Sequence, residues 1–296
     1  MQSSTRLFTL FLCTHVVISQ QARSAAVIVE SRWSQSFEYV IDNALIHLPN
    51  TFDVVLLVNP HVATQFLQQN RHAHNPRIYV NTAHVATTFS RQDYNVLIKQ
   101  RFLYESVLSR YDTILFFQTD TCFCRPFEDV YGRPEEYNDD DNDAAAASAA
   151  GVGYVGAVWD TSVSPKGFAC ATLRDPTLPR AHVQVGNGGF SLRSRQLSLD
   201  ILDRWGNASA HLPYNEDVWF ACGAHYLGKL SSQDQANRHC IESVPFVKGM
   251  EVPLGVHKPW AYQNIENLQR LANVCLPLQE LMKIRREREA TRLGEL

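Results

Sequence analysis

Nearly continuous apolar runs, separated by longer amphipathic stretches, constrain the fold of this chain most strongly. They cover residues 25–29, 53–58 and 113–117. A strand that is apolar on both faces must be covered on both, which is typical of parallel strands packed between helices. We expect a further, shorter strand over residues 77–80.

The stretches between these runs predict helices. Residues 34–47 follow the first run, and residues 93–108 precede the last, with Tyr94, Ile98 and Phe102 in one broad apolar arc. Strand, helix and strand at this spacing predict an α/β fold. We expect a Rossmann-type α/β/α sandwich with a central, mostly parallel (mixed) sheet in a single domain.

Composition excludes several classes of protein. Of 296 residues, 45% are hydrophobic and 19% charged, which excludes a disordered chain. The formal net charge of −3 shows none of the basic excess of a general nucleic-acid binder, so we expect no nucleic-acid partner.

The N-terminus bears on the compartment. An apolar run at residues 7–18 follows Arg6, and about 18 Å of helix is too short for a ~30 Å membrane core. We therefore expect residues 1–24 to be a signal peptide or leader, and the protein to lie in the secretory pathway, in the ER or Golgi lumen or secreted. The alternatives are a disordered leader on a cytoplasmic protein or an uncleaved start of the first strand. Membrane association is expected only if this segment is retained.

The remaining organisation follows from low complexity and charge. Residues 25–265 form the expected domain, interrupted at 138–150 by an acidic and alanine-rich insertion that we expect to be solvated. Residues 266–296 are expected to form a helical tail, exposed from residue 283 onward.

Cysteine usage permits disulfides without choosing among them. Seven cysteines are present, and removal of a leader takes Cys13 and leaves six, with fifteen complete pairings. The Cys122/Cys124 pair has no second pair nearby, so we expect no zinc site.

Polar residues directly after the buried runs are candidate ligands, because open parallel sheets bind ligands beyond the carboxyl ends of their strands. Glu30 and Arg32 follow the first run, and Gln118, Thr119 and Asp120 follow the 113–117 run. A carboxylate here can hold a divalent cation against a diphosphate. The alternative for Asp120 is a turn or helix-capping residue.

A glycine-rich segment at 186–192 contains Asn187, Gly188 and Gly189. Its backbone can approach a ligand closely, although a tight hairpin is the alternative. Adjacent carboxylates occur at Glu216 and Asp217, where one can act as a general base or both can begin a helix.

The segment 255–260 combines an imidazole, a cation and an indole. His257 can ligate a metal and Lys258 can neutralise phosphate, although a lone histidine is more often structural.

Taken together, these segments resemble the domain-of-unknown-function family 5672, a glycosyltransferase-like group. The similar segments are 25–32, 117–120, 154–159, 185–193, 215–220 and 255–260, in that order, and the resemblance spans roughly residues 25–265. It implies a GT-A-like fold and a glycosyltransferase class.

A further analogy implies the site. Nucleotide-sugar glycosyltransferases of the GT-A fold bind manganese through an Asp-x-Asp motif after a buried strand, and here the segment reads Gln118-Thr119-Asp120. The segment ending in Trp260 is similar to the Lys-Pro-Trp segment of glycogenin-like enzymes, where a nearby histidine completes the metal site. Residues 216–218 resemble the Glu-Asp-Val run of inverting galactosyltransferases.

The resemblance implies transfer of a sugar from a UDP- or GDP-sugar to a hydroxyl of a glycan, protein or small-molecule acceptor. Asp120 and His257 would hold a divalent cation, Mn²⁺, and Asp217, with Glu216 in reserve, would deprotonate the acceptor and invert the anomeric carbon. The expected donor contacts are Glu30, Arg32, Gln118, Thr119, Asn187, Gly188, Gly189 and Lys258, with Trp159 or Trp260 stacking on a sugar face.

Three other functions compete with this one. A non-catalytic, glycosyltransferase-shaped protein that binds a nucleotide sugar or carbohydrate is favoured by the missing first aspartate. A metal-dependent hydrolase would use Asp120, Asp217 and His257 but needs more ligands than these. A nucleotide-binding oxidoreductase is disfavoured because no glycine-rich phosphate loop follows the first strand.

Overall fold

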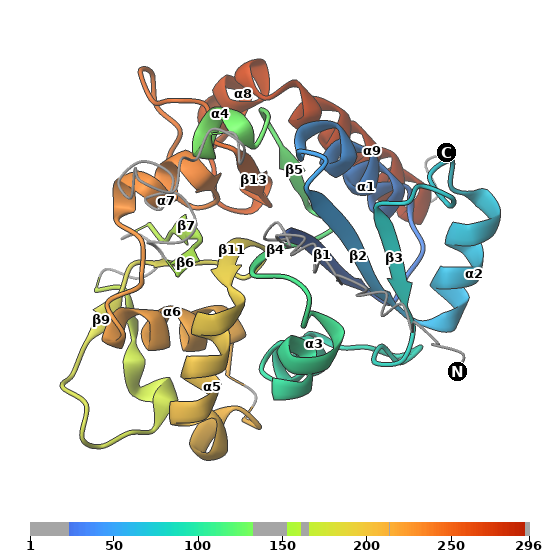
Figure 1. Cartoon of the computed structure of the whole chain (residues 1–296). Coiled ribbons are helices and arrows are strands. Elements are labelled where there is room, and N and C mark those ends of the chain that lie inside the picture. Colours follow the sequence, from blue (N-terminus) through green and yellow to red (C-terminus); the bar gives the residue numbers. More distant parts are fainter. Residues whose placement is uncertain (1–23, 133–152, 161–165, 213, 294–296) are drawn as a thin grey trace, which may run out of the picture.

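The computed structural model describes residues 24–132, 153–160, 166–212 and 214–293. Its main sheet has the strand order β3-β2-β1-β4-β11-β6 (Figure 1). These strands are β1 (Ser24–Glu30), β2 (Phe52–Val58), β3 (Ile78–Asn81), β4 (Thr113–Phe117), β6 (Tyr154–Val155) and β11 (Phe190–Ser194). The first four are parallel, and β11 runs antiparallel to both β4 and β6.

Helices cover both faces of this sheet. They are α1 (Gln35–His47), α2 (Pro60–Gln69), α3 (Arg91–Ile98), α4 (Glu128–Tyr131), α5 (Arg195–Ser209), α6 (Glu216–Tyr226), α7 (Gln233–His239), α8 (Ile265–Val274) and α9 (Leu276–Leu293). Shorter turns are the π-helical η1 (Leu103–Val107) and the 3₁₀ segments η4 (Cys170–Leu173) and η5 (Pro259–Ala261).

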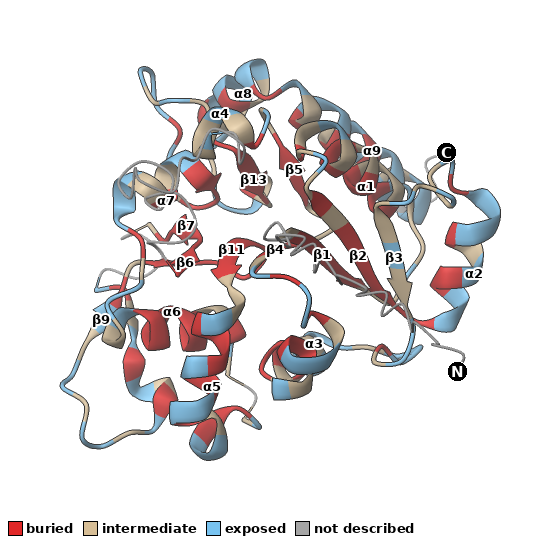
Figure 2. Ribbon diagram, in the orientation of Figure 1, coloured by how far each residue is buried: buried red, intermediate tan, exposed pale blue. Residues whose placement is uncertain are grey.

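The alternation of side chains along β1 explains why two cores form. Ala26 and Ile28 belong to the apolar cluster that includes residues of α1, α2, α8 and α9, whereas Ala25 and Val27 belong to the cluster with α3, α5 and α6. Figure 2 shows the central strands buried between these layers. The predicted α/β/α sandwich, with a mostly parallel central sheet and a single domain, is confirmed.

Three small sheets complete the fold and carry part of the cleft. One has the order β12-β13-β5, formed by β12 (Cys240–Ile241), β13 (Gly255–His257) and β5 (Thr121–Phe123). The others pair β7 (Ala157–Val158) with β10 (Val185–Gly186) and β8 (Phe168–Ala169) with β9 (His182–Val183). Because β5 follows β4 closely, the first small sheet lies at the carboxyl end of the main sheet.

The prediction of a continuous helix over 93–108 is wrong, since the structure has two separate elements there, α3 and η1. Lys99 caps α3, and its buried ammonium donates hydrogen bonds to the carbonyls of Leu212 (2.5 Å) and Tyr214 (3.1 Å). Burial lowers the pKa of Lys99 to about 8, although Glu216 opposes this shift. These long-range hydrogen bonds of Lys99 thus occur where α3 ends, inside a stretch whose local pattern predicts one continuous helix.

The C-terminal segment is helical and packs against the rest of the chain. Leu278 and Leu281 of α9 are buried, and α9 lies alongside α1 (Figure 1). From residue 283 most of its described side chains are exposed. The boundary expected at 265/266 lies at the start of α8, whose Leu271 belongs to the same apolar cluster as Leu278 and Leu281 of α9.

Two of the expected segments lie mostly or wholly outside the described residues. The expected leader at 1–24 lies outside the described residues except for Ser24, which begins β1, and the expected insertion at 138–150 lies wholly outside them. Among the described residues, no helix has the length and hydrophobicity needed to cross a membrane.

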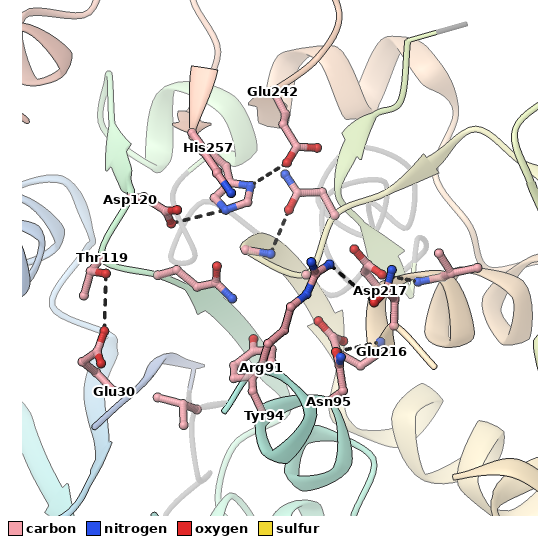
Figure 3. A pocket seen from close by; sticks show the side chains of 18 of the residues that line it. Glu30, Arg91, Tyr94, Asn95, Thr119, Asp120, Glu216, Asp217, Glu242 and His257 are labelled. Atoms are coloured by element: carbon pink, nitrogen blue, oxygen red, sulfur yellow. Dashed lines mark hydrogen bonds and ion pairs between the residues drawn. The ribbon is translucent and has the colours of Figure 1, made fainter. Parts of the chain in front are cut away.

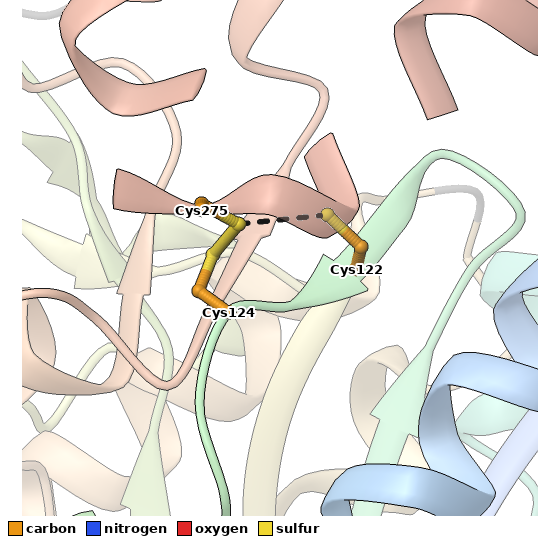
Figure 4. Close-up of side chains that lie close together, drawn as sticks. All are labelled: Cys122, Cys124 and Cys275. Carbon is orange, nitrogen blue, oxygen red and sulfur yellow. Dashed lines mark hydrogen bonds between the residues drawn. A yellow bond between two sulfur atoms is a disulfide. The ribbon is translucent and has the colours of Figure 1, made fainter. Parts of the chain in front are cut away.

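Two disulfides connect distant parts of the described chain. Cys124–Cys275 joins the segment after β5 to the junction of α8 and α9, and Cys170–Cys222 joins η4 to α6. Cys122 is a buried free thiol whose sulfur lies 4.0 Å from that of Cys275 (Figure 4). Burial raises the pKa of Cys122, which keeps this thiol protonated.

Removal of the Cys124–Cys275 disulfide should destabilise the protein by about 2–5 kcal/mol, because the crosslink closes a long loop. Urea unfolding of Cys124→Ala/Cys275→Ala measures this loss. Cys122→Ala is the matched control, since it removes one neighbouring buried sulfur and no crosslink. Equal losses in the two variants would contradict a stabilising role for the disulfide.

Candidate active site

A cavity of about 420 Å³ lies at the carboxyl ends of β1 and β4. Most of the residues singled out in the sequence line it (Figure 3). These are Glu30, Arg32, Gln118, Thr119, Asp120, Trp159, Asn187, Gly188, Gly189, Glu216, Asp217, His257 and Lys258. Segments more than 200 residues apart in the sequence therefore converge on one cleft.

The end of β1 forms a turn closed by its own carboxylate. Oε1 of Glu30 accepts hydrogen bonds from the backbone N–H groups of Ser31 (2.8 Å) and Arg32 (3.0 Å). Its Oε2 lies 3.4 Å from the Thr119 hydroxyl, which connects the ends of β1 and β4. Ser34 then caps α1 through the N–H of Phe37, so the turn leads directly into a helix.

His257 lies between two carboxylates. Its Nδ1 is 2.8 Å from Oε1 of Glu242, and its Nε2 is 3.3 Å from Oδ1 of Asp120 (Figure 3). The register of β13 with β5, which pairs His257 with Thr121, sets this position, and the N–H of Lys258 donates to the carbonyl of Asp120 (2.9 Å). The imidazole is thus fixed from both sides.

The charged groups in this cluster shift one another's pKa values. Burial lowers the pKa of His257, but Asp120 and then Glu242 outweigh it and raise that pKa to about 10. Burial also tends to raise the pKa of Asp120, yet His257 and Lys258 hold it below its ordinary value. Without a metal, the cluster is therefore an imidazolium between carboxylates.

The same donor set suits a divalent cation. Nε2 of His257 and Oδ1 of Asp120 are buried and face each other at 3.3 Å, and neither atom has a hydrogen-bond partner outside this ion pair. Glu242 binds the other ring nitrogen, as the carboxylate behind a metal-ligating histidine commonly does. An imidazole nitrogen and a carboxylate oxygen are ligands suited to Mn²⁺.

Gly188 and Gly189 allow two functional side chains to reach the backbone. A Cβ on Gly189 would overlap the His257 imidazole, and a Cβ on Gly188 would overlap the Glu216 carboxylate. The side chain of Asn187, a residue with φ of 72°, accepts a hydrogen bond from the N–H of Gly189 (2.8 Å). The turn between β10 and β11 is therefore both the tight turn that the sequence permitted and part of the cavity wall.

The adjacent carboxylates at the start of α6 have different surroundings. Glu216 is buried and forms a 2.7 Å ion pair with the buried Arg193 of β11. The Arg193 guanidinium also lies over the rings of Phe116, Tyr154 and Phe220, at 4.7–5.1 Å from their centroids. Glu216 raises the pKa of Arg193 against the effect of burial, so the arginine stays protonated. The Glu216 carboxylate therefore serves as the ion-pair partner of a buried arginine.

Asp217 is half-buried and lines the cavity. Its Oδ1 accepts a hydrogen bond from the N–H of Val218 (2.7 Å). Burial raises the pKa of Asp217, an effect that this backbone hydrogen bond only partly offsets. A carboxylate with a raised pKa is a stronger base than a free aspartate, which suits proton abstraction.

The two tryptophans lie in different places. Trp159 lines the cavity but is buried, with its ring against Gly186 and 4.5 Å from the Phe168 ring. Trp260 lines a neighbouring cavity and lies beneath the Arg285 guanidinium, 4.7 Å from its Cζ. In this conformation Trp260 is therefore not part of the main cavity wall.

Sequence reasoning missed Glu242 and Arg193. Glu242 follows β12, which has two residues and so gives no readable apolar run. Arg193 lies within β11, where a single charged residue in an apolar stretch is a signal for a buried partner that could have been noticed. Tyr94, Asn95 and Tyr262 also line the cavity, and the Asn95 side chain accepts a hydrogen bond from the Glu216 N–H (3.2 Å).

Residues 77–257 match the model of a family described as a protein of unknown function, DUF5672. This match covers more than half of the chain, and the chain belongs to that family. The resemblance identified from the six sequence segments is thus confirmed. No curated protein matches the sequence.

Several solved structures are similar to this one. Core-mannan synthase A of Aspergillus fumigatus, in an Mn/GDP form, has 8% sequence identity and a TM-score of 0.45, with 71% of this chain and 70% of that chain covered. The apo WbbM bifunctional glycosyltransferase has 14% identity and a TM-score of 0.46, with 90% and 52% covered, so this chain spans about half of its length. 4-Diphosphocytidyl-2C-methyl-D-erythritol synthase of Anaerococcus prevotii has 6% identity and a TM-score of 0.40, with 71% and 85% covered.

Breaking the Arg193–Glu216 pair from one side should destabilise the fold strongly. Arg193→Met leaves the Glu216 carboxylate buried without its partner, which costs about 3–5 kcal/mol in comparable cases. The double variant Arg193→Met/Glu216→Gln buries no charge and should recover much of the loss. Urea unfolding measures the wild type, the single variants Arg193→Met and Glu216→Gln, and the double variant. A double variant that loses the sum of both single losses would contradict this account.

Proposed function

We propose that the protein is a glycosyltransferase that transfers a sugar from a nucleoside diphosphate sugar, a UDP- or GDP-sugar, to a hydroxyl of a glycan, protein or small-molecule acceptor. The observation that carries the proposal is the convergence of Asp120, His257, Lys258 and Asp217 on one cleft. In this proposal, a cation site, a phosphate-neutralising cation and a general base share that cavity.

The donor lies across the strand ends in this proposal. The nucleotide base of the donor contacts the turn formed by Glu30 and Arg32, and the donor diphosphate lies near Thr119 and Lys258. The glycine-rich turn at 187–189 shapes the sugar pocket. The polar groups available in the turn after β1 and after β4 support this orientation.

Asp120 and His257 would hold a divalent cation, Mn²⁺ in our proposal. When bound, such an ion supplies a positive charge that stabilises the departing diphosphate. Glu242 fixes the ring orientation of His257, and Lys258 adds a second positive charge at the same edge of the cavity. The buried Nε2 and Oδ1 atoms, which face each other and have no hydrogen-bond partner outside their own ion pair, support this assignment.

Asp217 is the proposed general base. Its carboxylate takes the proton of the acceptor hydroxyl, and the acceptor oxygen attacks the anomeric carbon of the sugar. The bond between that carbon and the β-phosphate oxygen breaks, and the nucleoside diphosphate leaves with the electron pair. Attack from the face opposite the leaving group inverts the anomeric carbon. The ion pair of Glu216 with Arg193 supports assigning the role to Asp217 alone.

A non-catalytic nucleotide-sugar-binding protein is the second candidate. The observation that favours it is Gln118, which occupies the place of the first carboxylate of the Asp-x-Asp motif and lowers the negative charge available to a cation. A thermal-shift screen with UDP, GDP and their sugars, with and without Mn²⁺, identifies the donor for either function. Release of nucleoside diphosphate from the stabilising donor then separates the enzyme from the binding protein.

We also propose that the protein functions in the secretory pathway. The support is chemical, since disulfides such as the two in the described chain persist in oxidising compartments and are rare in the cytosol.

Asp217→Asn should lower the kcat for donor turnover by at least about 100-fold, because the amide cannot accept the acceptor proton. Donor affinity, measured by calorimetry, should change little. Asp234→Asn is the matched control, since Asp234 is an exposed aspartate in the first turn of α7. A parallel loss of turnover and donor binding in Asp217→Asn would count against the base assignment.

Removing a proposed cation ligand should weaken Mn²⁺ binding. Asp120→Asn and His257→Gln should each lower the affinity by at least about tenfold, and Glu242→Gln by about 10–100-fold through loss of its support for His257. Paramagnetic resonance of free Mn²⁺ reports the affinity without any activity assay. Asp217→Asn should keep wild-type affinity, and equal affinity in all variants would remove the cation site.

A further inference from the structure

A second cavity of about 320 Å³ lies beside the main one. The two share the side chains of Arg32, Thr119, Asp120 and Lys258, so they meet at the proposed cation site. The outer wall of the second cavity is α9, which lies alongside α1 (Figure 1). A ligand there would therefore lie at the edge that the two cavities share.

The second cavity is strongly cationic. Five of its lining side chains are arginine or lysine, and only Asp120 and Glu289 are acidic. The chain as a whole has a formal charge of −3, so this concentration of positive charge opposes the overall composition. Converging cations in a small space raise the local concentration of anions and favour a multiply charged one.

The arginines of α9 are arranged in two ways. Arg285 is held in place, because it stacks on Trp260 and its Nη2 forms a 2.7 Å ion pair with Glu289. Arg288 and Arg292 are exposed and form no ion pair with any residue that the structure describes. They lie one turn apart on the helix, so both guanidinium groups remain available to an incoming anion.

We propose that this second cavity is a phosphate subsite, in which Arg288, Arg292 and Lys258 bind a phosphate group of a substrate. Guanidinium groups bind phosphate oxygens in bidentate fashion, and a dianion matches several converging cations better than a single carboxylate does. The phosphate belongs either to the acceptor or to the donor diphosphate. Its identification as part of a substrate rests on the proposed glycosyltransferase function.

Inorganic pyrophosphate is the probe, titrated calorimetrically into the full chain at low ionic strength without metal. Arg288→Gln/Arg292→Gln should lower its affinity by at least about tenfold. The control is Lys283→Gln/Arg286→Gln, which removes the same charge from exposed positions of α9 that do not line the cavity. The control should bind as the wild type does, and thermal unfolding verifies that both variants are folded.

Three outcomes would overturn the subsite. These are absence of pyrophosphate binding to the wild type, equal affinity in the Arg288/Arg292 variant, and an equal loss in the charge-matched control, which would reduce the effect to net charge. The assay uses neither donor nor turnover, so failure of the glycosyltransferase proposal leaves its result interpretable. Failure of the subsite likewise leaves the Asp217 and Mn²⁺ tests intact.

Repeating the titration with saturating nucleoside diphosphate and Mn²⁺ identifies the source of the phosphate. If pyrophosphate still binds, the subsite accommodates an additional phosphate, as a phosphorylated acceptor would supply. If the nucleotide excludes pyrophosphate and itself binds at least about tenfold more weakly to the Arg288/Arg292 variant, the donor diphosphate occupies the subsite. Either result supports a phosphate subsite on α9.

Discussion

The imidazole of His257, held between Asp120 and Glu242, is the interaction on which the cleft depends. It connects three elements that are separate in the sequence, namely the segment after β4, the segment after β12 and the end of β13. A positive imidazole, or a cation bound to a neutral one, offsets the repulsion between two carboxylates brought together at low solvent exposure. Without such a charge, electrostatic repulsion would drive the two carboxylates of this cluster apart.

Glycine-rich backbone makes this close packing possible. Gly188 and Gly189 lie between the two charge clusters of the cleft, one against Glu216 and the other against His257. A side chain at either position would separate the backbone from the functional groups. The same turn therefore positions the Arg193–Glu216 pair on one side and the proposed cation ligands on the other.

Much of the fold was predictable because local signals and tertiary structure agree. The runs at 25–29, 53–58 and 113–117 became β1, β2 and β4, since strands that are apolar on both faces have few alternatives to burial within a sheet. The prediction of one continuous helix over 93–108 was wrong, because the Lys99 ammonium at the end of α3 is buried against carbonyls more than 100 residues away along the chain. The periodicity of apolar residues carries no information about such a long-range contact.

The sequence by itself determined which residue types were available for chemistry and that they follow strands or turns, because apolar runs and glycines specify where strands end. Only the tertiary structure decided which of two neighbouring residues forms an ion pair and which is available for chemistry. Glu216 and Asp217 are adjacent, chemically alike and both line the cavity, yet the Glu216 carboxylate is paired with Arg193 and that of Asp217 forms no ion pair with any described residue. Trp260 and the α9 arginines similarly define a separate cavity, because burial and charge pairing depend on partners that are distant along the chain.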